Sequence, residues 1–307
     1  AGKQVSLLAR GPTLAAVQAN GLQLQTGAAA APHTQRFDLH ASADAASLGP
    51  QDLVIIAVKA PALRAVAQQI GPLIGPDTVV LTAMNGVPWW FLHGFGGTLR
   101  GKALESVDPG GAIAAAIGAD HVIGGVVHAS CSVAAPGVIR HGFGNKIIVG
   151  EPSGERSARV SALAALLQAG GFEAPVSERI QRDIWFKLWG NMTVNPVSAF
   201  TGATSTQIMD DPLVLAFCSR VMLEARAIGA AFGVPIDQEP ADRHVVTRKL
   251  GAFKTSMLQD VEAGKAVELD ALVSSVRELG QLTGVATPEI DTLLGLARLH
   301  ARVHGLY

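Results

Sequence analysis

The chain has 307 residues, enough for two domains of ordinary size; 49% of them are hydrophobic and only 5% aromatic, which favours packed α/β layers and helix-on-helix contacts over an all-β sandwich. A formal net charge of −1 without a basic run argues against a nucleic-acid-binding surface. No stretch approaches the ~18 consecutive apolar residues that a membrane span needs, so we expect no membrane segment.

The start of the sequence lacks the features of a signal peptide. Cys131 and Cys218 lie far apart and outside any C-x-x-C pattern, so we expect two reduced structural thiols and a cytoplasmic protein. The histidines show no ligand spacing, and we expect no metal.

Short apolar runs with little alternation mark the first half of the chain. Val5–Ala9, Leu53–Val58 and Val79–Ala83 are typical of strands buried on both faces, and helical periodicity over Ala60–Ile74 separates the last two. This order predicts βαβ units and a parallel sheet. Leu22–Ser42 is predicted to form a hairpin or an irregular excursion. Further runs, separated by turns with glycine, are predicted as antiparallel additions: Val122–Val127, Val138–His141 and Lys146–Val149.

From about Ser177 onward the pattern indicates helices only. The predicted helices are Arg179–Val194, Pro212–Phe232, Pro240–Gly264, Asp270–Gly284 and Pro288–Gly305. We therefore expect two domains, residues 1–177 and 178–307, with a ligand pocket at the seam between them. Asp108–Ala119, rich in glycine and alanine, is the most loop-like stretch.

Polar residues close the predicted buried strands of the first half. Arg10 ends the first, Lys59 the second, and Asn85-Gly86 the third. Alone, Arg10 is an ordinary strand-end charge. Because such sheets bind ligands at the carboxyl ends of their strands, and an arginine there can accept the 2′-phosphate of NADP, the three together favour a nucleotide site.

The glycine-rich turn of such a site is absent from the given sequence. No G-x-G-x-x-G follows a first strand, and about 20 further residues upstream would supply the missing first strand and its turn. The alternatives are a truncated sequence or an unusual way of holding a dinucleotide. We favour truncation, because a sheet without its central strand would expose apolar edges.

Lys187, Asn191 and Asn195 stand four residues apart in an apolar helical run. That spacing places them in one narrow stripe of a helix. A solvated helix face is the ordinary interpretation of such a pattern, but flanks that include Trp185 and Trp189 leave little room for one. Gly190 has no side chain, so a ligand could approach the helix closely beside the stripe. We therefore predict the wall of a pocket for a small, oxygen-rich, anionic molecule.

These motifs together resemble the ketopantoate reductase family (NADP-dependent 2-dehydropantoate 2-reductases). The matching parts run through nearly the whole chain in the right order: strand-end Lys59, Asn85-Gly86, P-G-x-I-x-H-G-x-G at Pro136–Gly144, K-L-x-x-N-x-x-x-N-P at Lys187–Pro196, and S-M-L-Q-D…E-x-D at Ser256–Asp270. The resemblance implies a Rossmann-like, mostly parallel sheet domain followed by an all-helical substrate and dimerisation domain. It implies NADP as cofactor and a role in pantothenate and coenzyme A synthesis, and leaves a homodimer open.

The resemblance also implies roles for individual residues. Lys187 matches the proton-donating lysine, and Glu268 the glutamate at the substrate and the nicotinamide. Asn191, Asn195 and Ser256 match substrate-binding residues. Asn85 matches the asparagine between cofactor and substrate. The remaining cofactor contacts fall on Arg10, Lys59 and Ser130.

Two departures from the family pattern bear on the identity of the substrate more than on the type of reaction. Ser205 stands where some members carry a further asparagine, and Trp89–Asp120 is longer than expected. From sequence alone, Glu268 could point outward or into a pocket.

The residues fit the reduction of a ketone. A lysine ammonium stabilises the charge that develops on the ketone oxygen and then supplies the proton, and an apolar setting would lower its pKa from ~10.4 towards the working pH. A 2-oxo acid with a hydroxyl at its far end suits all of these groups.

Two alternatives stay open. A reductase on the same plan could act on a different 2-oxo or β-hydroxy acid, which a substrate panel would reveal. The second alternative is a protein without catalytic activity, either a reductase-derived binding protein or an inactive truncated product. An in-frame G-x-G-x-x-G ahead of Ala1 would favour the enzyme.

Overall fold

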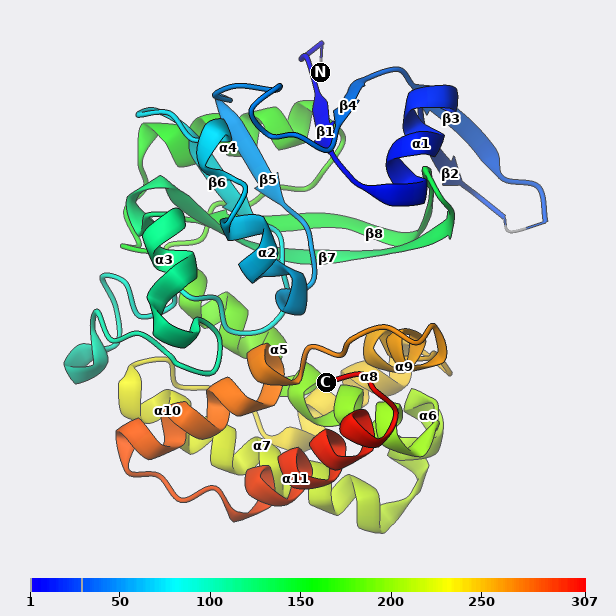
Figure 1. Cartoon of the computed structure of the whole chain (residues 1–307). Coiled ribbons are helices and arrows are strands. Elements are labelled where there is room, and N and C mark those ends of the chain that lie inside the picture. The colour runs from blue at the N-terminus through cyan, green and yellow to red at the C-terminus, as the bar shows by residue number, and fades with distance from the viewer. Residues whose placement is uncertain (1, 29) are drawn as a thin grey trace. The chain divides into compact units, whose positions relative to one another are not determined.

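A computed structural model describes residues 2–28 and 30–307, which form two compact units (Figure 1). The first unit runs through Ile56 and adds Ala65–Ala83 and Ala116–Glu178. The second unit combines Ala57–Arg64, Met84–Ala115 and Arg179–Tyr307. The chain therefore leaves the sheet after two of its strands to join the helical unit. The domain boundary after residue 177 stays a proposal.

A mostly parallel sheet of six strands forms the frame of the first unit, with the order β3-β2-β8-β7-β6-β5. The pairs β5–β6, β6–β7 and β2–β8 are parallel, whereas β2–β3 and β7–β8 are antiparallel. β1 and β4 form a separate parallel pair. The strands are β1 Ser6–Leu8, β2 Leu22–Thr26, β3 His33–Phe37, β4 His40–Ser42, β5 Leu53–Ile56, β6 Val79–Thr82, β7 Val122–Ala135 and β8 Val138–Gly150.

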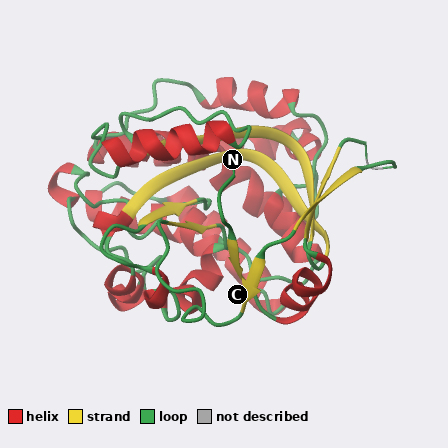
Figure 2. Cartoon of the chain, turned by 90° about the horizontal axis from the view of Figure 1, so that it is seen from above, coloured by secondary structure: helices red, strands yellow, loops and turns green. Residues whose placement is uncertain are grey.

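The predicted strands after residue 120 are longer in the structure than in the sequence pattern. β7 and β8 form one long antiparallel hairpin that turns at Pro136-Gly137, and Figure 2 shows both strands curving along their length. We predicted a turn with glycine between Val138–His141 and Lys146–Val149, and this was wrong, because β8 runs through both. The pairing is irregular between His128 and Cys131, and a Cβ on Gly142 would lie 3.3 Å from the carbonyl oxygen of Ser130. The glycines therefore let the strands approach at a bulge.

Short helices connect the strands. They are α1 Gly11–Asn20 and α2 Leu63–Ala67, with 3₁₀ turns at Ala60–Ala62 and Gly71–Leu73, and α4 Ala158–Ala169 follows the last strand. The periodicity over Ala60–Ile74 thus corresponds to one short helix between two turns. Pro61 and Pro72 stand in the first turns of these 3₁₀ segments, because proline fits the start of a helix and disrupts its interior.

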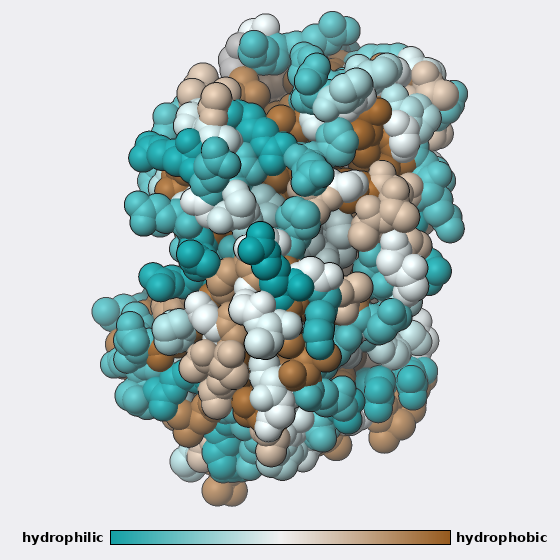
Figure 3. All heavy atoms as spheres, turned by 90° about the vertical axis from the view of Figure 1, so that its left-hand side faces the viewer, coloured by the Kyte–Doolittle hydropathy of each residue, from teal (hydrophilic) through white to brown (hydrophobic). Residues whose placement is uncertain are grey.

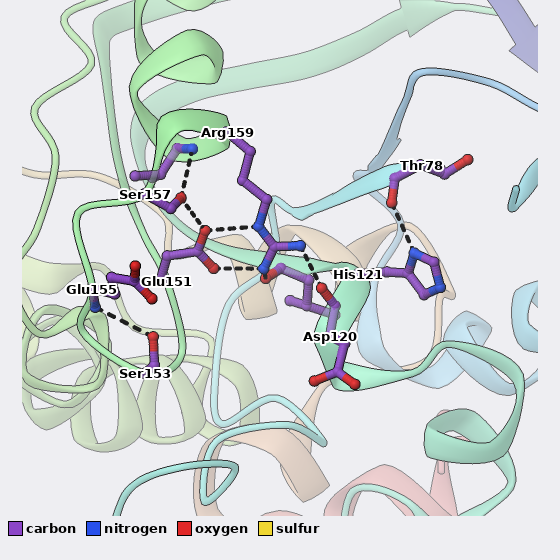
Figure 4. A network of polar contacts seen from close by, with 10 residues as sticks. Thr78, Asp120, His121, Glu151, Ser153, Glu155, Ser157 and Arg159 are labelled. Atoms are coloured by element: carbon purple, nitrogen blue, oxygen red, sulfur yellow. Dashed lines mark hydrogen bonds and ion pairs between the residues drawn. The ribbon is translucent and has the colours of Figure 1, made fainter. Parts of the chain in front are cut away.

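α4 closes the first unit over the sheet. Its Val160, Leu163 and Leu167 pack with Leu81, Ile123 and Val149 from β6, β7 and β8. A polar network fixes its start (Figure 4). The buried carboxylate of Glu151 accepts hydrogen bonds from Nε and Nη2 of Arg159, at 2.7 and 2.6 Å, and from Ser157, the N-cap of α4. Arg159 also donates to the carbonyl of Asp120, so α4 is tied to the segment that enters β7.

The second unit is helical, with α5 at its centre against α7, α9 and α11 (Figure 1). Its helices are α3 Ala112–Ala116, α5 Ile180–Thr201, α6 Ser205–Asp210, α7 Pro212–Phe232, α8 Pro240–Lys249, α9 Ser256–Glu262, α10 Ser275–Thr283 and α11 Pro288–Val303. A π-helical turn, Asp270–Ser274, leads into α10.

Two predicted helices in this unit have different bounds. Pro240–Gly264 is divided into α8 and α9, because the chain bends between them around Gly251, which has a φ of 75°. The helix predicted to end at Val194 continues through Pro196 to Thr201 and ends at Gly202, with a φ of 74°. Tertiary packing overrides the proline here, since residues 192–199 are all buried.

The segment Met84–Ala115 packs into the helical unit through its aromatic residues. Phe91 is completely buried and lies 6.2 Å from Trp185 of α5 and 5.9 Å from Phe232 of α7, between ring centroids. Glu278 of α10 accepts hydrogen bonds from the backbone N–H groups of Glu105 and Ser106. The segment is therefore an integral part of this unit.

In the described part of the chain, no helix combines the length and apolar character that crossing a bilayer requires. On the face drawn in Figure 3, hydrophilic residues (teal) are interspersed with hydrophobic ones (brown). Exposed apolar side chains such as Leu213 and Val303 are common on protein surfaces.

Candidate active site

The predicted polar stripe lies on α5, as its spacing indicates. Lys187 and Asn191 are partly buried, and Asn195 is 8% exposed. The indoles of Trp185 and Trp189 are each 1% exposed and form the apolar surroundings expected from the sequence. The stripe is therefore not a solvated helix face.

Lys187 is held by a residue from a distant part of the sequence. Its Nζ donates a hydrogen bond of 2.7 Å to Oδ1 of Asn85, which follows β6. Both residues belong to the second unit. The contact joins two of the predicted site residues, and it uses one of the three N–H donors that an ammonium carries.

Gly86 explains why glycine follows Asn85. Its φ is 82°, and a Cβ at this position would lie 2.5 Å from the carbonyl oxygen of Ala271. The next residue, Val87, donates its N–H to that same carbonyl at 2.8 Å. The Asn85-Gly86 turn therefore packs against the π-helical turn at Ala271, which follows Glu268 by three residues.

Glu268 is buried, which answers the question that its sequence context left open. It is 6% exposed, and its Oε1 accepts a hydrogen bond of 3.0 Å from the N–H of Ala60. Burial raises the pKa of the Glu268 carboxyl, while the bond from Ala60 and the charge of Lys59 oppose this rise. The carboxylate is held by the segment that follows β5.

Lys59 lies beside this carboxylate but forms an ion pair with Asp260 of α9. The Asp260 side chain is 7% exposed and that of Lys59 is 44% exposed. The lysine predicted to contact the cofactor therefore also fastens the segment after β5 to α9, within the second unit.

Burial lowers the pKa of Lys187 to about 8. The negative charge of Glu268 acts in the opposite direction, and the positive charge of Arg243 lowers the pKa further. An amine with this pKa is mostly an ammonium at neutral pH and can release its proton readily. It can therefore stabilise an oxyanion and then protonate it.

Arg243 of α8 occupies the space beside Gly190, where we predicted the approach of a ligand. A Cβ on Gly190 would lie 2.6 Å from Nε of Arg243. The guanidinium also lies over the Phe186 ring, 5.4 Å from its centroid. The glycine therefore accommodates a side chain of the protein itself.

The remaining predicted residues belong to other segments of the two units. Ser256 is the exposed first residue of α9. Arg10 and Ser130 belong to the first unit. Arg10 is exposed between β1 and α1, and Ser130 is partly buried on β7, paired with Phe143 of β8.

Sequence reasoning missed three groups at the site: the Asp260 carboxylate, the Ala60 N–H and the Arg243 guanidinium. Asp260 stands in the S-M-L-Q-D motif, where its buried position could have been suspected. Arg243 stands in a charged run that is typical of an exposed helix, and a backbone N–H carries no sequence signal.

Comparison with known proteins agrees with this architecture. Residues 1–89 match the family model described as "Ketopantoate reductase PanE/ApbA", and residues 179–301 match "Ketopantoate reductase PanE/ApbA C terminal". A 2-dehydropantoate 2-reductase from Mesorhizobium japonicum is 48% identical over 306 residues, which are 99% of this chain and 92% of the relative.

Solved structures are similar over the whole length. A protein from Ralstonia solanacearum MolK2, described as a candidate ketopantoate reductase, has a TM-score of 0.93 and 56% identity, covering 100% of this chain and 92% of its own. The 2-dehydropantoate 2-reductase from Geobacter metallireducens has a TM-score of 0.83 and 25% identity, covering 97% and 92%.

A mostly parallel sheet unit joined to a helical unit that carries a partly buried lysine and a buried glutamate is the plan of a nicotinamide-dependent oxidoreductase. The chain belongs to the ketopantoate reductase family.

Proposed function

We propose that the chain reduces 2-dehydropantoate to pantoate with NADPH. The observation that carries the proposal is the Lys187–Asn85 hydrogen bond, together with a Lys187 pKa of about 8. It places a readily released proton on a group that a neutral carboxamide orients. Membership of the ketopantoate reductase family supports this substrate.

The proposed chemistry adds a hydride and a proton across a ketone. The reduced nicotinamide, when bound, supplies the hydride to the ketone carbon. Lys187 donates a hydrogen bond to the ketone oxygen, stabilises the negative charge that develops there and transfers its Nζ proton. Asn85 keeps the ammonium oriented throughout, because its oxygen accepts a hydrogen bond without adding a charge.

The residues proposed for the cofactor have suitable chemistry. Arg10 is exposed where β1 ends and α1 begins, so a cationic side chain stands at the N-cap of a helix, the end that favours anions. Both features suit a phosphate. Ser130 and Asn85 are proposed neutral contacts, and Glu268 is proposed at the nicotinamide. We propose Lys59 as a further basic contact, one that also forms the ion pair with Asp260.

The substrate is proposed to lie along α5. Asn191 and Asn195 follow Lys187 by one and two helical turns and can donate hydrogen bonds to substrate oxygens. Glu268 and Ser256 are proposed to bind the hydroxyl, since a carboxylate accepts a hydrogen bond from a hydroxyl and repels another carboxylate.

A substrate panel tests the proposal. Purified protein is mixed with NADPH and either 2-dehydropantoate or another 2-oxo acid, and oxidation of the nicotinamide and formation of the hydroxy acid are followed. We expect the highest kcat/KM with 2-dehydropantoate. A higher value with another 2-oxo acid would assign the chain to a different reductase activity. Absence of any turnover, with the cofactor bound, would favour a non-catalytic protein.

We also propose that the protein is cytoplasmic, acts in pantothenate synthesis and forms a homodimer through its helical unit. Growth of a pantothenate-requiring strain on expression of the chain would test the pathway role. Sedimentation analysis would test the dimer.

A further inference from the structure

Arg243 is held beside Lys187 by contacts that orient its guanidinium. It comes from α8 and reaches α5 at Gly190, one turn beyond Lys187. Any side chain at residue 190 would displace it, because even a Cβ would lie 2.6 Å from Nε. On the neighbouring turn, its guanidinium lies over the Phe186 ring at 5.4 Å.

The guanidinium has hydrogen-bonding capacity that the protein leaves unused. Its Nε is buried and has no hydrogen-bond partner among residues 2–28 and 30–307. Within those residues, Arg243 also forms no ion pair. A buried donor without a partner destabilises a protein, and more so when the group is charged. Such a group suggests a ligand that is absent from the isolated chain.

The charges around Lys187 indicate the sign of that ligand. Lys187 and Arg243 are both cationic and act on each other through their charges, while Glu268 is the carboxylate that acts on Lys187. Lys59 and Asp260, which also act on Glu268, neutralise each other in an ion pair. An anion would therefore relieve the repulsion between Lys187 and Arg243.

We propose that Arg243 binds the carboxylate of the 2-oxo acid substrate. This inference rests on the proposed function, in which the ketone oxygen lies at Lys187. In a 2-oxo acid the carboxylate carbon is bonded directly to the ketone carbon, so the group that recognises the carboxylate lies next to the one that meets the ketone oxygen. Nε and a terminal nitrogen of arginine form a planar fork that matches two carboxylate oxygens.

Arg243 thereby makes the site selective for acids over neutral ketones. A ketone without the carboxylate would leave the guanidinium both desolvated and unpaired, and sites with buried polar groups reject such analogues strongly. Phe186 covers one face of the guanidinium and so helps to fix its orientation.

The experiment compares Arg243→Gln with wild type on an acid and on its neutral counterpart, 2-dehydropantoate and its methyl ester. We expect kcat/KM for the acid to fall roughly 10- to 100-fold, the effect of losing a charged hydrogen bond, while the value for the ester changes little. Arg243→Lys should recover part of the loss. Equal losses on acid and ester would overturn the proposal.

A matched control lies on the same helix. Arg248 forms an exposed ion pair with Asp210, so Arg248→Gln should leave the ratio of acid to ester unchanged. A binding measurement separates this inference from the proposed function: calorimetry with pantoate and with its neutral lactone needs no turnover. If Arg243→Gln weakens pantoate binding but not lactone binding, the inference holds even where ketone reduction fails. If both ligands bind the variant as they bind wild type, the inference fails.

Discussion

The ammonium of Lys187 and the carboxamide of Asn85 form a hydrogen bond of 2.7 Å between residues 102 positions apart in the chain. Asn85 holds Lys187 through a neutral acceptor, so burial controls the pKa of the amine. A carboxylate in the same place would raise that pKa and retain the proton. An asparagine at position 85 therefore favours a lysine that can donate its proton to a substrate.

Lys187→Ala is expected to abolish ketone reduction and to leave NADPH binding nearly unchanged. Loss of a general acid costs ~10²–10⁴ in rate. Single-turnover reduction and fluorescence titration of NADPH measure the two effects separately. A variant that keeps more than about a tenth of the wild-type rate would remove Lys187 from the proton-donor role.

The pH dependence of kcat/KM for reduction should report the Lys187 pKa. The reaction needs the ammonium, whose fraction declines as pH rises through about 8. We expect kcat/KM to be level below this pH and to fall about tenfold per pH unit above it. Asn85→Ala removes a hydrogen bond to the ammonium, so it should move this limb to lower pH. A limb that stays in place in Asn85→Ala would contradict the assignment.

The sequence predicts the local parts of the site better than its contacts. The stripe on α5 is readable because helical periodicity is a local property, and its apolar flanks indicate burial. The partnership of Lys187 with Asn85 is a tertiary contact that no local pattern contains. The position of Glu268 was undecidable for the same reason, since it depends on the Ala60 N–H from a distant segment.

In the fold, too, local elements can be predicted from the sequence better than tertiary contacts. The mostly parallel sheet and the helical second half follow from apolar periodicity, whereas element ends depend on packing. Pro196 lies inside α5 because the residues around it are all buried. Gly142 lies within a continuous strand because β8 bulges at this residue against β7. Gly190 looked open to a ligand, and only the structure places Arg243 against it.

Gly86→Ala should destabilise the protein more than an ordinary glycine substitution at positive φ. The new Cβ would meet the Ala271 carbonyl at 2.5 Å, in addition to the strain of a φ of 82°. We expect a loss of about 2–4 kcal/mol in the free energy of unfolding. Activity should fall too, because Asn85 would shift.

Gly284→Ala is the matched control. Its φ is 73° and no atom of a residue outside its immediate neighbourhood lies within 4 Å of where a Cβ would stand, so this variant carries the strain without the clash. We expect a loss of about 1 kcal/mol and unchanged activity. Urea unfolding of both variants decides the matter; equal losses would mean that the Ala271 contact is unimportant.

Arg10→Ala should reduce the preference for NADPH over NADH. An exposed arginine at the start of α1 suits the 2′-phosphate, which NADH lacks. kcat/KM for NADPH should fall while that for NADH stays nearly constant. Arg36→Ala, which removes an exposed arginine paired with Asp38 in the same unit, is the control. An unchanged ratio in Arg10→Ala would contradict the role.

Glu268→Gln is expected to weaken the use of 2-dehydropantoate far more than that of 2-oxoisovalerate, which lacks the hydroxyl. The buried carboxylate accepts one hydrogen bond from Ala60 and has further lone pairs for a substrate hydroxyl. A substrate without the hydroxyl leaves those lone pairs unsatisfied in wild type, so wild-type protein should discriminate strongly between the two acids.

The amide of the variant keeps an oxygen for the Ala60 N–H but replaces the other carboxylate oxygen by a donor, so the discrimination should shrink. Steady-state kcat/KM for both acids, in wild type and variant, measures this. The proposed role of Glu268 concerns the hydroxyl and that of Arg243 the carboxylate, so Arg243→Gln should lower both values together. If wild type uses 2-oxoisovalerate as well as 2-dehydropantoate, the hydroxyl assignment is wrong, and a reductase for another 2-oxo acid becomes the better account.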